Sequence, residues 1–543
     1  MSSEAVRPLR GVDLPAAPYE TGQAAARERD LRASVTWLAE RRRRALVGDE
    51  VATRKRHDQG RLTARERVLL LLDEGTFMET DLFARHRATG FGLEDRRADT
   101  DGVVTGWGEV HGRRIAVASH DARILGGSLG ETFAAKVHKI QDLAESSGIP
   151  LVVVNDGGGA RIQEGVMSLA GFGGIFRRNV RASGVIPQIS VVAGACAGGA
   201  AYSPALTDFV FMVDDASTMF VTGPDVVASV TGEQVSADDL GGPDLHATST
   251  GVATFVSADE AACLEDVRYL LSFLPANSDE RPPRYEPADS PDRRCPELQD
   301  LVPSDPRRSY DVREVITAVV DDGEYLELHE RWARNVVCAL ARVDGSTVGI
   351  VANQPAWLAG ALDIDAAEKA ARFVQTCDAF NIPLVTLVDV PGFLPGREQE
   401  SDGIVRRGAK LLHAYCAATV PRISIILRKA YGGAYIAMDS KAIGADLVVA
   451  WPSNEISVMG PDAAASIVFR RQIEAADDPE QRRSELVAEY VDRLVHPLAA
   501  AERGLVDDVI DPADTRWALV RALALLATKN VPPTRHKHGN GPL

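Results

Sequence analysis

The amino-acid sequence predicts an α/β protein made of two tandem copies of one domain. Short apolar runs alternate with helical patterns along most of the chain, which is typical of parallel β-α-β units. Four segments recur in the same order in the two halves, and a segment rich in Pro and Asp separates these halves. A chain of 543 residues is long enough to bury two sizeable cores.

The internal repeat is visible as four pairs of matching segments. Chance similarity does not keep four segments in one order, so the pattern indicates a duplicated domain. Three pairs are offset by 233 or 234 positions and the last by 237. The pairs are "SSGIPLVVVND" (146–156) with "AFNIPLVTLVD" (379–389), "GVIPQISVV" (184–192) with "ATVPRISII" (418–426), the Gly-Gly-Ala steps at 198–200 and 432–434, and "VTGPD" (221–225) with "VMGPD" (458–462).

The repeat and the composition together predict the domain boundaries. The N-terminus is rich in small residues, contains Pro and has no apolar period, and the segment between the copies has no apolar period either. We therefore expect a flexible N-terminus (1–25), a first domain (26–280), a linker (281–308), a second domain (309–530) and a flexible tail (531–543).

The elements of the first copy follow from local patterns. Residues 22–58 are charged and helix-prone, and Thr63 with Glu66 fits a capping box ahead of an apolar run. The stretch 100–125 alternates as β-strands joined by a Gly-bearing turn. The pattern then predicts helices at 129–146 and 166–182, strands at 150–155 and 188–194, and a helix beginning near Gly198.

The basic run "ERRRRAL" within the first helical segment has two interpretations. Charge runs of this kind form the solvated face of a helix in most proteins. The alternative is a docking surface for a partner subunit.

Bulk composition excludes several classes of function. A net charge of −17 argues against a nucleic-acid binder. The six cysteines form no Cys-x-x-Cys pair, so we expect no zinc or other metal site, and with no disulfide framework they predict a reducing cytoplasm. The N-terminus lacks an apolar signal core, and no apolar run is long enough to span a membrane.

The duplicated Gly-Gly-Ala step is the best candidate for a catalytic site. The first N–H groups of a helix have no internal partner and lie at the positive end of its dipole. Two glycines before such a helix let a ligand approach the backbone, which suits an oxyanion hole. The alternative is a tight helix–strand contact. Because the step occurs twice, we predict two oxyanion holes that hold two carbonyl-like oxygens, as a carboxyl transfer between two carriers requires.

Longer motifs resemble the carboxyltransferase (β) subunits of biotin-dependent acyl-CoA carboxylases, especially the acetyl-/propionyl-CoA carboxylase β chains of actinobacteria. The resemblance covers roughly 30–530 in one order. Its motifs include "NDGGGARIQEGV", "CAGGAAYSPALTDFVFM", "LGGPDLHATSTGVA", "LDIDAAEKAARFV", "VDVPGFLPG" and "ILRKAYGGAYIAM".

The resemblance implies two tandem crotonase-like domains, ββα spirals of the ClpP/crotonase superfold. The first would bind acyl-CoA and the second biotin, in a homo-hexamer whose active sites lie between the first domain of one chain and the second domain of another. Backbone N–H groups of Gly198 and Gly199 would hold the thioester oxygen. Those of Gly433 and Ala434 would hold the ureido oxygen of biotin, beside Tyr435.

The mechanism implied by the resemblance needs no side-chain base. Carboxybiotin loses CO₂, the biotin nitrogen takes the α-proton of the acyl group, and the resulting enolate attacks the CO₂. The product is malonyl-CoA or (S)-methylmalonyl-CoA. Ile436 stands where related propionyl-CoA-selective chains carry Asp, and so predicts a chain that accepts acetyl-CoA and propionyl-CoA.

Other residues are expected to bind the substrate or to order its loops. Arg161 is the best side-chain candidate, as an exposed arginine for CoA phosphates or as an ion-pair partner of Glu164. Asn353 and Gln354 are expected to order a CoA-associated segment. The expected substrate-binding set is Ile436, Gly158, Gly159, Ala160, Arg161, Gly127, Asn353, Gln354 and Asp363.

Several single residues look catalytic in isolation and are assigned other roles. We expect His120 and Asp121 to act in a turn, and Cys196 to pack as a small residue. Ser203 lacks a Gly-x-Ser-x-Gly elbow. Asp389 is expected to order a loop.

Missing motifs predict the partners. The chain has no biotinylation segment and no ATP-grasp signature. It would therefore depend on a biotin carboxylase, which uses ATP and bicarbonate, and on a biotin carrier, both in an α subunit, with a small ε subunit as a further candidate. The alternatives are a biotin-dependent (methyl)malonyl-CoA decarboxylase subunit, a biotin-free crotonase-type enzyme and a catalytically silent assembly subunit.

Overall fold

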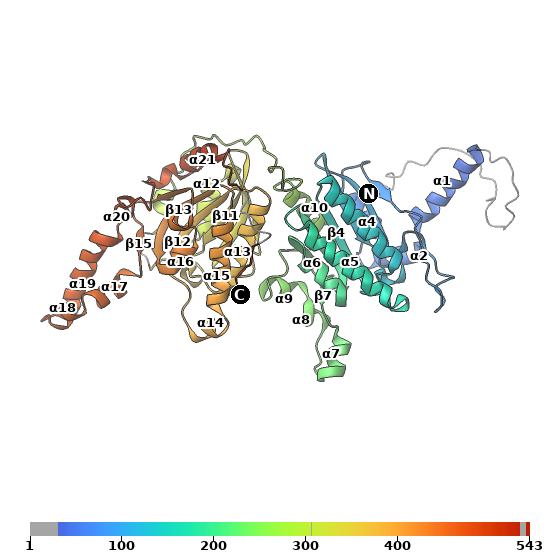
Figure 1. The fold of residues 1–543 in the computed structure, drawn as a ribbon, viewed down its shortest axis with the longest axis horizontal. Helices are drawn as coiled ribbons and strands as arrows, with labels where there is room; N and C mark the ends of the chain where they lie inside the picture. The colour runs from blue at the N-terminus through green and yellow to red at the C-terminus, as the bar shows by residue number, and fades with distance from the viewer. Residues whose placement is uncertain (1–30, 304, 306, 533–538, 543) are drawn as a thin grey trace.

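The chain forms two α/β bodies that lie side by side, each built on one eight-stranded sheet (Figure 1). The computed structural model describes residues 31–303, 305, 307–532 and 539–542. The predicted fold class is confirmed. The expected flexible N-terminus (1–25) lies outside the described residues, as does most of the expected flexible tail.

The two sheets have the same topology, so the repeat found in the sequence is a repeat of structure. In each sheet the first three strands are antiparallel and the remaining strands are parallel. The first sheet runs β1 (Met78–Thr80), β2 (Val103–Val110), β3 (Arg113–His120), β4 (Leu151–Gly157), β5 (Gln188–Ala197), β6 (Phe209–Val213) and β8 (Phe255–Ser257), with β7 (Thr218–Phe220) on β5. The second runs β9 (Tyr325–Leu328), β10 (Val336–Val343), β11 (Ser346–Asn353), β12 (Leu384–Val390), β13 (Arg422–Tyr431), β14 (Leu447–Ala450) and β16 (Asp508–Val509), with β15 (Glu455–Ser457) on β13.

Helices cover the sheets and extend from them. In the first body α4 packs on β2, β3 and α5, and in the second α13 packs on β10, β11 and α15. Helices α1, α7 and the α17–α19 group project from the two bodies (Figure 1). The main helices of the first half are α1 (Leu31–Val47), α2 (Glu50–Asp58), α3 (Ala64–Leu71), α4 (Glu131–Ser147), α5 (Val166–Ala182), α6 (Tyr202–Ala205), α7 (Pro224–Thr231), α8 (Ala237–Gly241), α9 (Pro243–Thr248) and α10 (Glu260–Leu271). Those of the second half are α11 (Leu298–Leu301), α12 (Val312–Val319), α13 (Ile364–Ala379), α14 (Arg397–Ser401), α15 (Ile404–Ala417), α16 (Gly432–Ala437), α17 (Pro461–Val468), α18 (Arg470–Glu474), α19 (Pro479–Tyr490), α20 (Pro497–Ala501) and α21 (Thr515–Leu526).

Local signals place these elements as expected. Every residue of β4 and of β12 is buried, as continuous apolar runs in parallel sheets predict. The capping box of Thr63 and Glu66 is confirmed at the start of α3. Helix α4 ends at Gly148, whose φ of 60° is the left-handed conformation that glycine adopts at low cost.

The two bodies contact each other directly, and the linker is packed. The amide N–H of His329 donates to the carbonyl of Thr254 at 3.1 Å, and Arg342 donates to Ser272 Oγ at 2.8 Å. Within the expected linker, Cys295 and Leu298 are buried in the core of the second body. No helix of the described residues is both long and apolar enough to cross a membrane.

A buried lysine occupies the same place in each copy. Lys136 donates to the carbonyl of Thr100 at 2.9 Å, and Lys369, 233 positions later, donates to the carbonyls of His329 and Trp332 at 3.0 and 2.9 Å. Burial lowers the pKa of Lys136 to about 8. Each ammonium therefore ties a helix to a loop that carries residues with positive φ, Thr100 in the first copy and His329 in the second.

Candidate functional site

Each copy has a strand that ends in a left-handed glycine and turns directly into a helix. Gly198 has a φ of 65° after β5, and Gly432 has a φ of 59° after β13. A 3₁₀ turn (Gly198–Ala201) and α6 follow the first glycine, and α16 begins at the second. Among the described residues no side chain caps either helical start, so no side chain competes with a ligand for the first backbone N–H groups.

The two turns match in the repeat but differ in exposure. Gly199 is half-buried, while its counterpart Gly433 is exposed. Gly433 and Ala434 correspond in the repeat to Gly199 and Ala200, one position later than the pair Gly198 and Gly199 expected on the acyl-CoA side. Gly199 and Gly433 are thus the donors that the two turns have in common.

A glycine loop lies directly beside the first turn. The N–H of Gly158 donates to the carbonyl of Gly126 at 3.1 Å, and the N–H of Leu129 donates to the carbonyl of Gly159 at 2.8 Å. A Cβ on Gly159 would lie 2.8 Å from the carbonyl oxygen of Ala197, and a Cβ on Gly127 would overlap the carbonyl oxygen of Asp156. The structure therefore brings the expected residues Gly127, Gly158, Gly159 and Ala160 together next to Gly198.

Arg161 is buried, so the expectation of an exposed arginine is wrong. Its side chain is 1% exposed. Its Nη1 lies 2.8 Å from both Asp101 Oδ1 and Glu164 Oε1, and its Nη2 donates to the carbonyl of Ser128 at 2.9 Å. The alternative, an ion pair with Glu164, is present. Arg161 holds the glycine loop and cannot reach a CoA phosphate in this arrangement.

Asn353 and Gln354 are also buried, and they act on their own loop. Asn353 Nδ2 donates to the carbonyl of Gly360 at 3.1 Å, and Gln354 Nε2 donates to Asp311 Oδ1 at 2.6 Å. Both side chains are 0% exposed, which agrees with the expected loop ordering and leaves neither accessible to a substrate in this chain. Asp363 caps α13 by accepting the N–H of Ala366 at 2.9 Å.

Helix α16 presents two further expected residues. Ile436 is 43% exposed, so its side chain is accessible on the surface of α16. Tyr435 is half-buried, and burial raises the pKa of its hydroxyl to about 12, which keeps it protonated at neutral pH.

The side chains that look catalytic in isolation are engaged elsewhere. Burial lowers the pKa of His120 to about 4, and its ring packs against Phe133 at 4.9 Å between centroids. Ser203 Oγ donates to Asn179 Oδ1 at 2.9 Å. Burial raises the pKa of the Cys196 thiol to about 12.

The two remaining carboxylates are also paired. Asp121 binds the side chain of Arg123 at 2.7 Å. Asp389 is buried and forms an ion pair with Arg428 at 3.0 Å, which agrees with the expected ordering role. The described residues contain no group of three or more His, Cys, Asp or Glu side chains that could hold a metal.

An arginine-lined cavity was not predicted from the sequence. Its volume is about 370 Å³, and it reaches Ile124 and Leu125 at the turn that leads to Gly127. Arg96 and Arg97 are exposed there, and within the described part of the chain no ion pair engages either side chain. The charged lining residues are Arg44, Arg65, Arg85, Arg96, Arg97, Arg123, Asp49, Asp99 and Asp121.

The basic run "ERRRRAL" is mostly exposed on the first helix, which agrees with a solvated face and with a docking surface alike. Arg42, Arg43 and Arg44 are exposed, and Arg43 and Arg44 pair with Glu40 on the same helix. Arg41 is the exception, because it forms an ion pair with Asp99.

Comparison with known proteins gives one family for nearly the whole chain. A family model described as "Carboxyl transferase domain" matches residues 55–541. The propionyl-CoA carboxylase carboxyltransferase subunit of Haloferax mediterranei is 54% identical over 509 residues, which cover 93% of this chain and 98% of the relative. The methylmalonyl-CoA decarboxylase subunit alpha of Propionigenium modestum is 51% identical over 499 residues, which cover 92% and 96%.

The fold agrees with a solved relative. The crystal structure of transcarboxylase 12S superposes with a TM-score of 0.93 at 50% identity, and covers 96% of this chain and 100% of that chain. That structure describes a hexamer assembly with methylmalonyl-coenzyme A and methylmalonic acid bound.

The second turn predicts an asymmetric response to two neighbouring substitutions. Gly432→Ala adds a Cβ 2.9 Å from the carbonyl of Val458 at a φ of 59°, whereas a Cβ on Gly433 meets nothing within 4 Å. We expect Gly432→Ala to lower the free energy of unfolding by about 2 kcal/mol and Gly433→Ala by less than about 0.5 kcal/mol. Denaturant titration of both variants measures the difference. Equal stabilities would contradict this description of the turn.

Proposed function

The chain belongs to the carboxyl transferase family, and from this we propose that it moves a carboxyl group from carboxybiotin to the α-carbon of a short acyl-CoA. The acceptors are acetyl-CoA and propionyl-CoA, and the products are malonyl-CoA and (S)-methylmalonyl-CoA. The observation that carries the proposal is the pair of uncapped helical starts, one in each copy.

In this proposal backbone N–H groups, and not side chains, stabilise the transition state. Carboxylation replaces an α-proton by a carboxyl group, and the negative charge passes through the thioester oxygen. The N–H groups of Gly198 and Gly199 hold that oxygen, and each fixed donor is worth about 3–4 kcal/mol of transition-state stabilisation. Biotin, carried by a partner subunit, supplies the carboxyl group when it binds at Gly433, Ala434 and Tyr435. His120 packs against Phe133, Ser203 is hydrogen-bonded to Asn179 and Cys196 is buried, which agrees with a reaction that uses no side-chain base.

The two helical starts of one chain lie in different bodies (Figure 1). We propose that each site combines the first turn of one chain with the second turn of another. The projecting helices α7 and α17 favour such an assembly, because exposed apolar side chains often mark protein–protein contacts. Val230 on α7 and Ile467 on α17 lie at matching positions of the repeat and are 78% and 66% exposed. The hexamer of transcarboxylase 12S supports a homo-hexamer here, with each site shared between two chains.

The arginine-lined cavity takes over the role expected of Arg161. The charged end of CoA carries phosphates, and clustered arginines suit phosphate recognition. The cavity contacts the start of the Leu125–Gly127 turn, and the glycine loop contacts its end. One ligand can therefore extend from the cavity along this turn to Gly198. Arg96 and Arg97 are the side chains most available to it.

Ile436 sets the choice of acyl group in this proposal. Its exposed side chain on α16 gives an apolar wall beside the second turn. One methylene in such a pocket changes binding by only about 1–3 kcal/mol, so both short acyl groups are accepted.

The partners follow from the chemistry that this chain lacks. A biotin carrier and a biotin carboxylase that uses ATP and bicarbonate belong to an α subunit, and a small ε subunit is a further candidate. No metal is assigned to this chain. The relative from Propionigenium modestum favours a second candidate function, a subunit of a methylmalonyl-CoA decarboxylase that runs the transfer in reverse.

The proposal is tested with the purified chain, malonyl-CoA or methylmalonyl-CoA, and free biotin. We expect both acyl-CoA esters to lose their carboxyl group only when biotin is present. Loss at the same rate without biotin would contradict carboxyl transfer and would indicate a biotin-free decarboxylase. A carboxylation assay with the α subunit and ATP then separates the carboxylase from the decarboxylase that runs the transfer in reverse.

The cavity assignment predicts a change in KM. Arg97→Met removes one free guanidinium from the cavity, so the KM for malonyl-CoA should rise about 5- to 10-fold while kcat changes less than about twofold. The difference should shrink at high salt because the contact is electrostatic. Arg87→Met is the matched control, since Arg87 is exposed on the same loop outside the cavity lining. Equal KM values for the two variants would refute the assignment.

A further inference from the structure

Each copy buries one aspartate opposite a bulge in the neighbouring strand. Between β4 and β5 the pairing jumps from Asn155 with Val192 to Gly157 with Cys196, so residues 193–195 face Asp156 alone. Between β12 and β13 the same jump leaves 427–429 facing Asp389. The two aspartates are 233 positions apart and are 5% and 0% exposed. A buried carboxylate requires a cation, because an unpaired one costs several kcal/mol.

The second copy takes its cations from the bulge itself. Arg428 Nε donates to Asp389 Oδ2 at 3.0 Å, and Lys429 Nζ lies 3.9 Å from Asp389 Oδ1. The backbone N–H of Lys429 also donates to Asp389 Oδ1 at 3.1 Å. The carboxylate is therefore neutralised by the strand that continues into Gly432.

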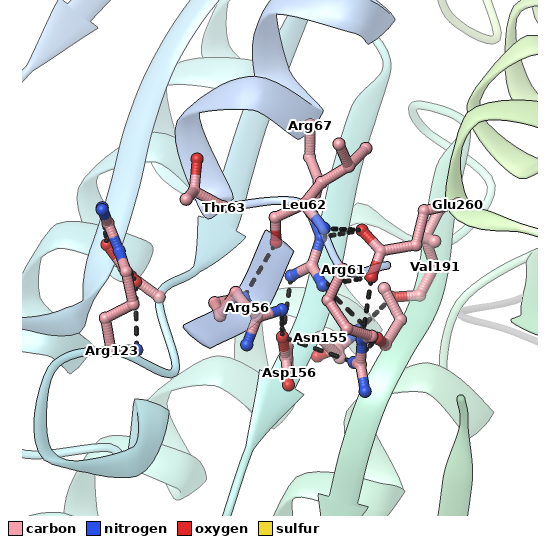
Figure 2. Close-up of polar contacts among 12 residues, drawn as sticks. Arg56, Arg61, Leu62, Thr63, Arg67, Arg123, Asn155, Asp156, Val191 and Glu260 are labelled. Carbon is pink, nitrogen blue, oxygen red and sulfur yellow. Dashed lines mark hydrogen bonds and ion pairs between the residues drawn. The ribbon is translucent and has the colours of Figure 1, made fainter. Parts of the chain in front are cut away.

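The first copy takes its cations from a distant segment of the chain. Arg56 Nη2 donates to Asp156 Oδ2 at 2.7 Å, Arg67 Nη1 lies 2.9 Å from the same oxygen, and Arg61 Nη2 lies 3.7 Å from it (Figure 2). Arg61 and Arg67 also bind Glu260, at 3.0 and 2.8 Å. Here the bulge is Ala193, Gly194 and Ala195, which carries no charge.

Gly194 explains why the cations cannot come from the bulge in this copy. A Cβ on Gly194 would overlap the carboxylate of Asp156 and lie 2.7 Å from Arg61 Nη2. Arg61 also donates to the carbonyl of Ala193, and Arg67 donates to it at 3.4 Å. The arginine segment thus fills the space that the side chain of Arg428 takes in the second copy, and it holds the bulge as well as the carboxylate.

The groups that these arginines hold, Asp156 and the bulge at 193–195, directly precede the segments that we propose to bind acyl-CoA. Asp156 is followed by Gly157 and the glycine loop, and the carbonyl of Asp156 packs on Gly127. The bulge at 193–195 is followed by Gly198. A shift of either would move the donors that face the thioester oxygen, and a displacement of about 1 Å at a catalytic group can lower the rate about 100-fold.

We propose that Arg56, Arg61 and Arg67 are positioning residues for the reaction, which act through Asp156 on the glycine loop and on Gly198. The segment 56–67 is then an essential part of the first site, whereas the second copy takes its counter-ions from the bulge itself. This inference rests on the proposed function.

The test compares Arg56→Met with a matched arginine in the full-length protein. Arg56 pairs with Asp156 and donates to the carbonyl of Leu62 at 3.0 Å. Arg268 pairs with Asp73 at 2.9 Å and donates to the carbonyl of Leu71 at 2.7 Å, at a similar exposure of 16% against 13%. Arg268→Met therefore removes the same kind of contact away from both turns. Arg56→Lys, which keeps the charge, is the conservative variant.

In biotin-dependent decarboxylation of malonyl-CoA, Arg56→Met should lower kcat about 10- to 100-fold with KM changed less than about threefold. Arg268→Met should stay within about twofold of the wild type, and Arg56→Lys should recover most of the lost kcat. A kcat for Arg56→Met equal to that of Arg268→Met would overturn the inference. A wild-type protein without biotin-dependent turnover would instead remove the proposed function itself.

Hydrogen–deuterium exchange gives a second readout, with the repeat as an internal control. In Arg56→Met the segments 157–160 and 193–198 should exchange faster, while their counterparts 390–393 and 427–432 should not change. Equal acceleration in both copies would mean a global loss of stability and would overturn the inference. If Arg56→Met fails to fold, Asp156→Asn, which keeps the shape of the side chain, is measured in the same two assays against the same outcomes.

Discussion

Both turns depend on a bulge between two neighbouring strands of each sheet. In each copy three residues bulge opposite one buried aspartate, and the strand then ends in a glycine with positive φ. The buried carboxylate fixes the bulge, because separating this carboxylate from its cations would cost several kcal/mol. The glycine then turns the chain so that the first N–H groups of the next helix face outward.

The duplication preserved this backbone and changed the side chains that support it. Lys136 and Lys369 do the same work in both copies, and Asp156 and Asp389 keep their place. Their counter-ions differ. Those of Asp156 come from α2, α3 and the loop between them (Figure 2), and those of Asp389 come from the bulge. The backbone keeps the same geometry although the cations that surround it differ between the copies. The shared geometry therefore reflects the function of the turn, which is to present backbone N–H groups, and not the packing around it.

The sequence predicts the repeated fold and the two turns because their signals are local. Apolar runs such as 150–155 mark buried strands, and the Gly-Gly-Ala step marks each helical start. The burial of Arg161 was not predictable, because its partner Asp101 lies sixty positions earlier on another loop. The same holds for Arg56 and Asp156, which are one hundred positions apart. Contacts of this kind follow from how the elements pack, and no periodic pattern in the chain reports them.

Two copies of the chain are central to this account, because one chain places its two turns in separate bodies. Complementation tests this most directly. One variant carries Gly198→Val and the other carries Gly432→Val, so that each has one damaged turn and is inactive alone. If each site combines the first turn of one chain with the second turn of another, mixed assemblies should recover biotin-dependent decarboxylation at about a quarter of their sites. Mixed assemblies that stay inactive, with the oligomer intact, would contradict the account.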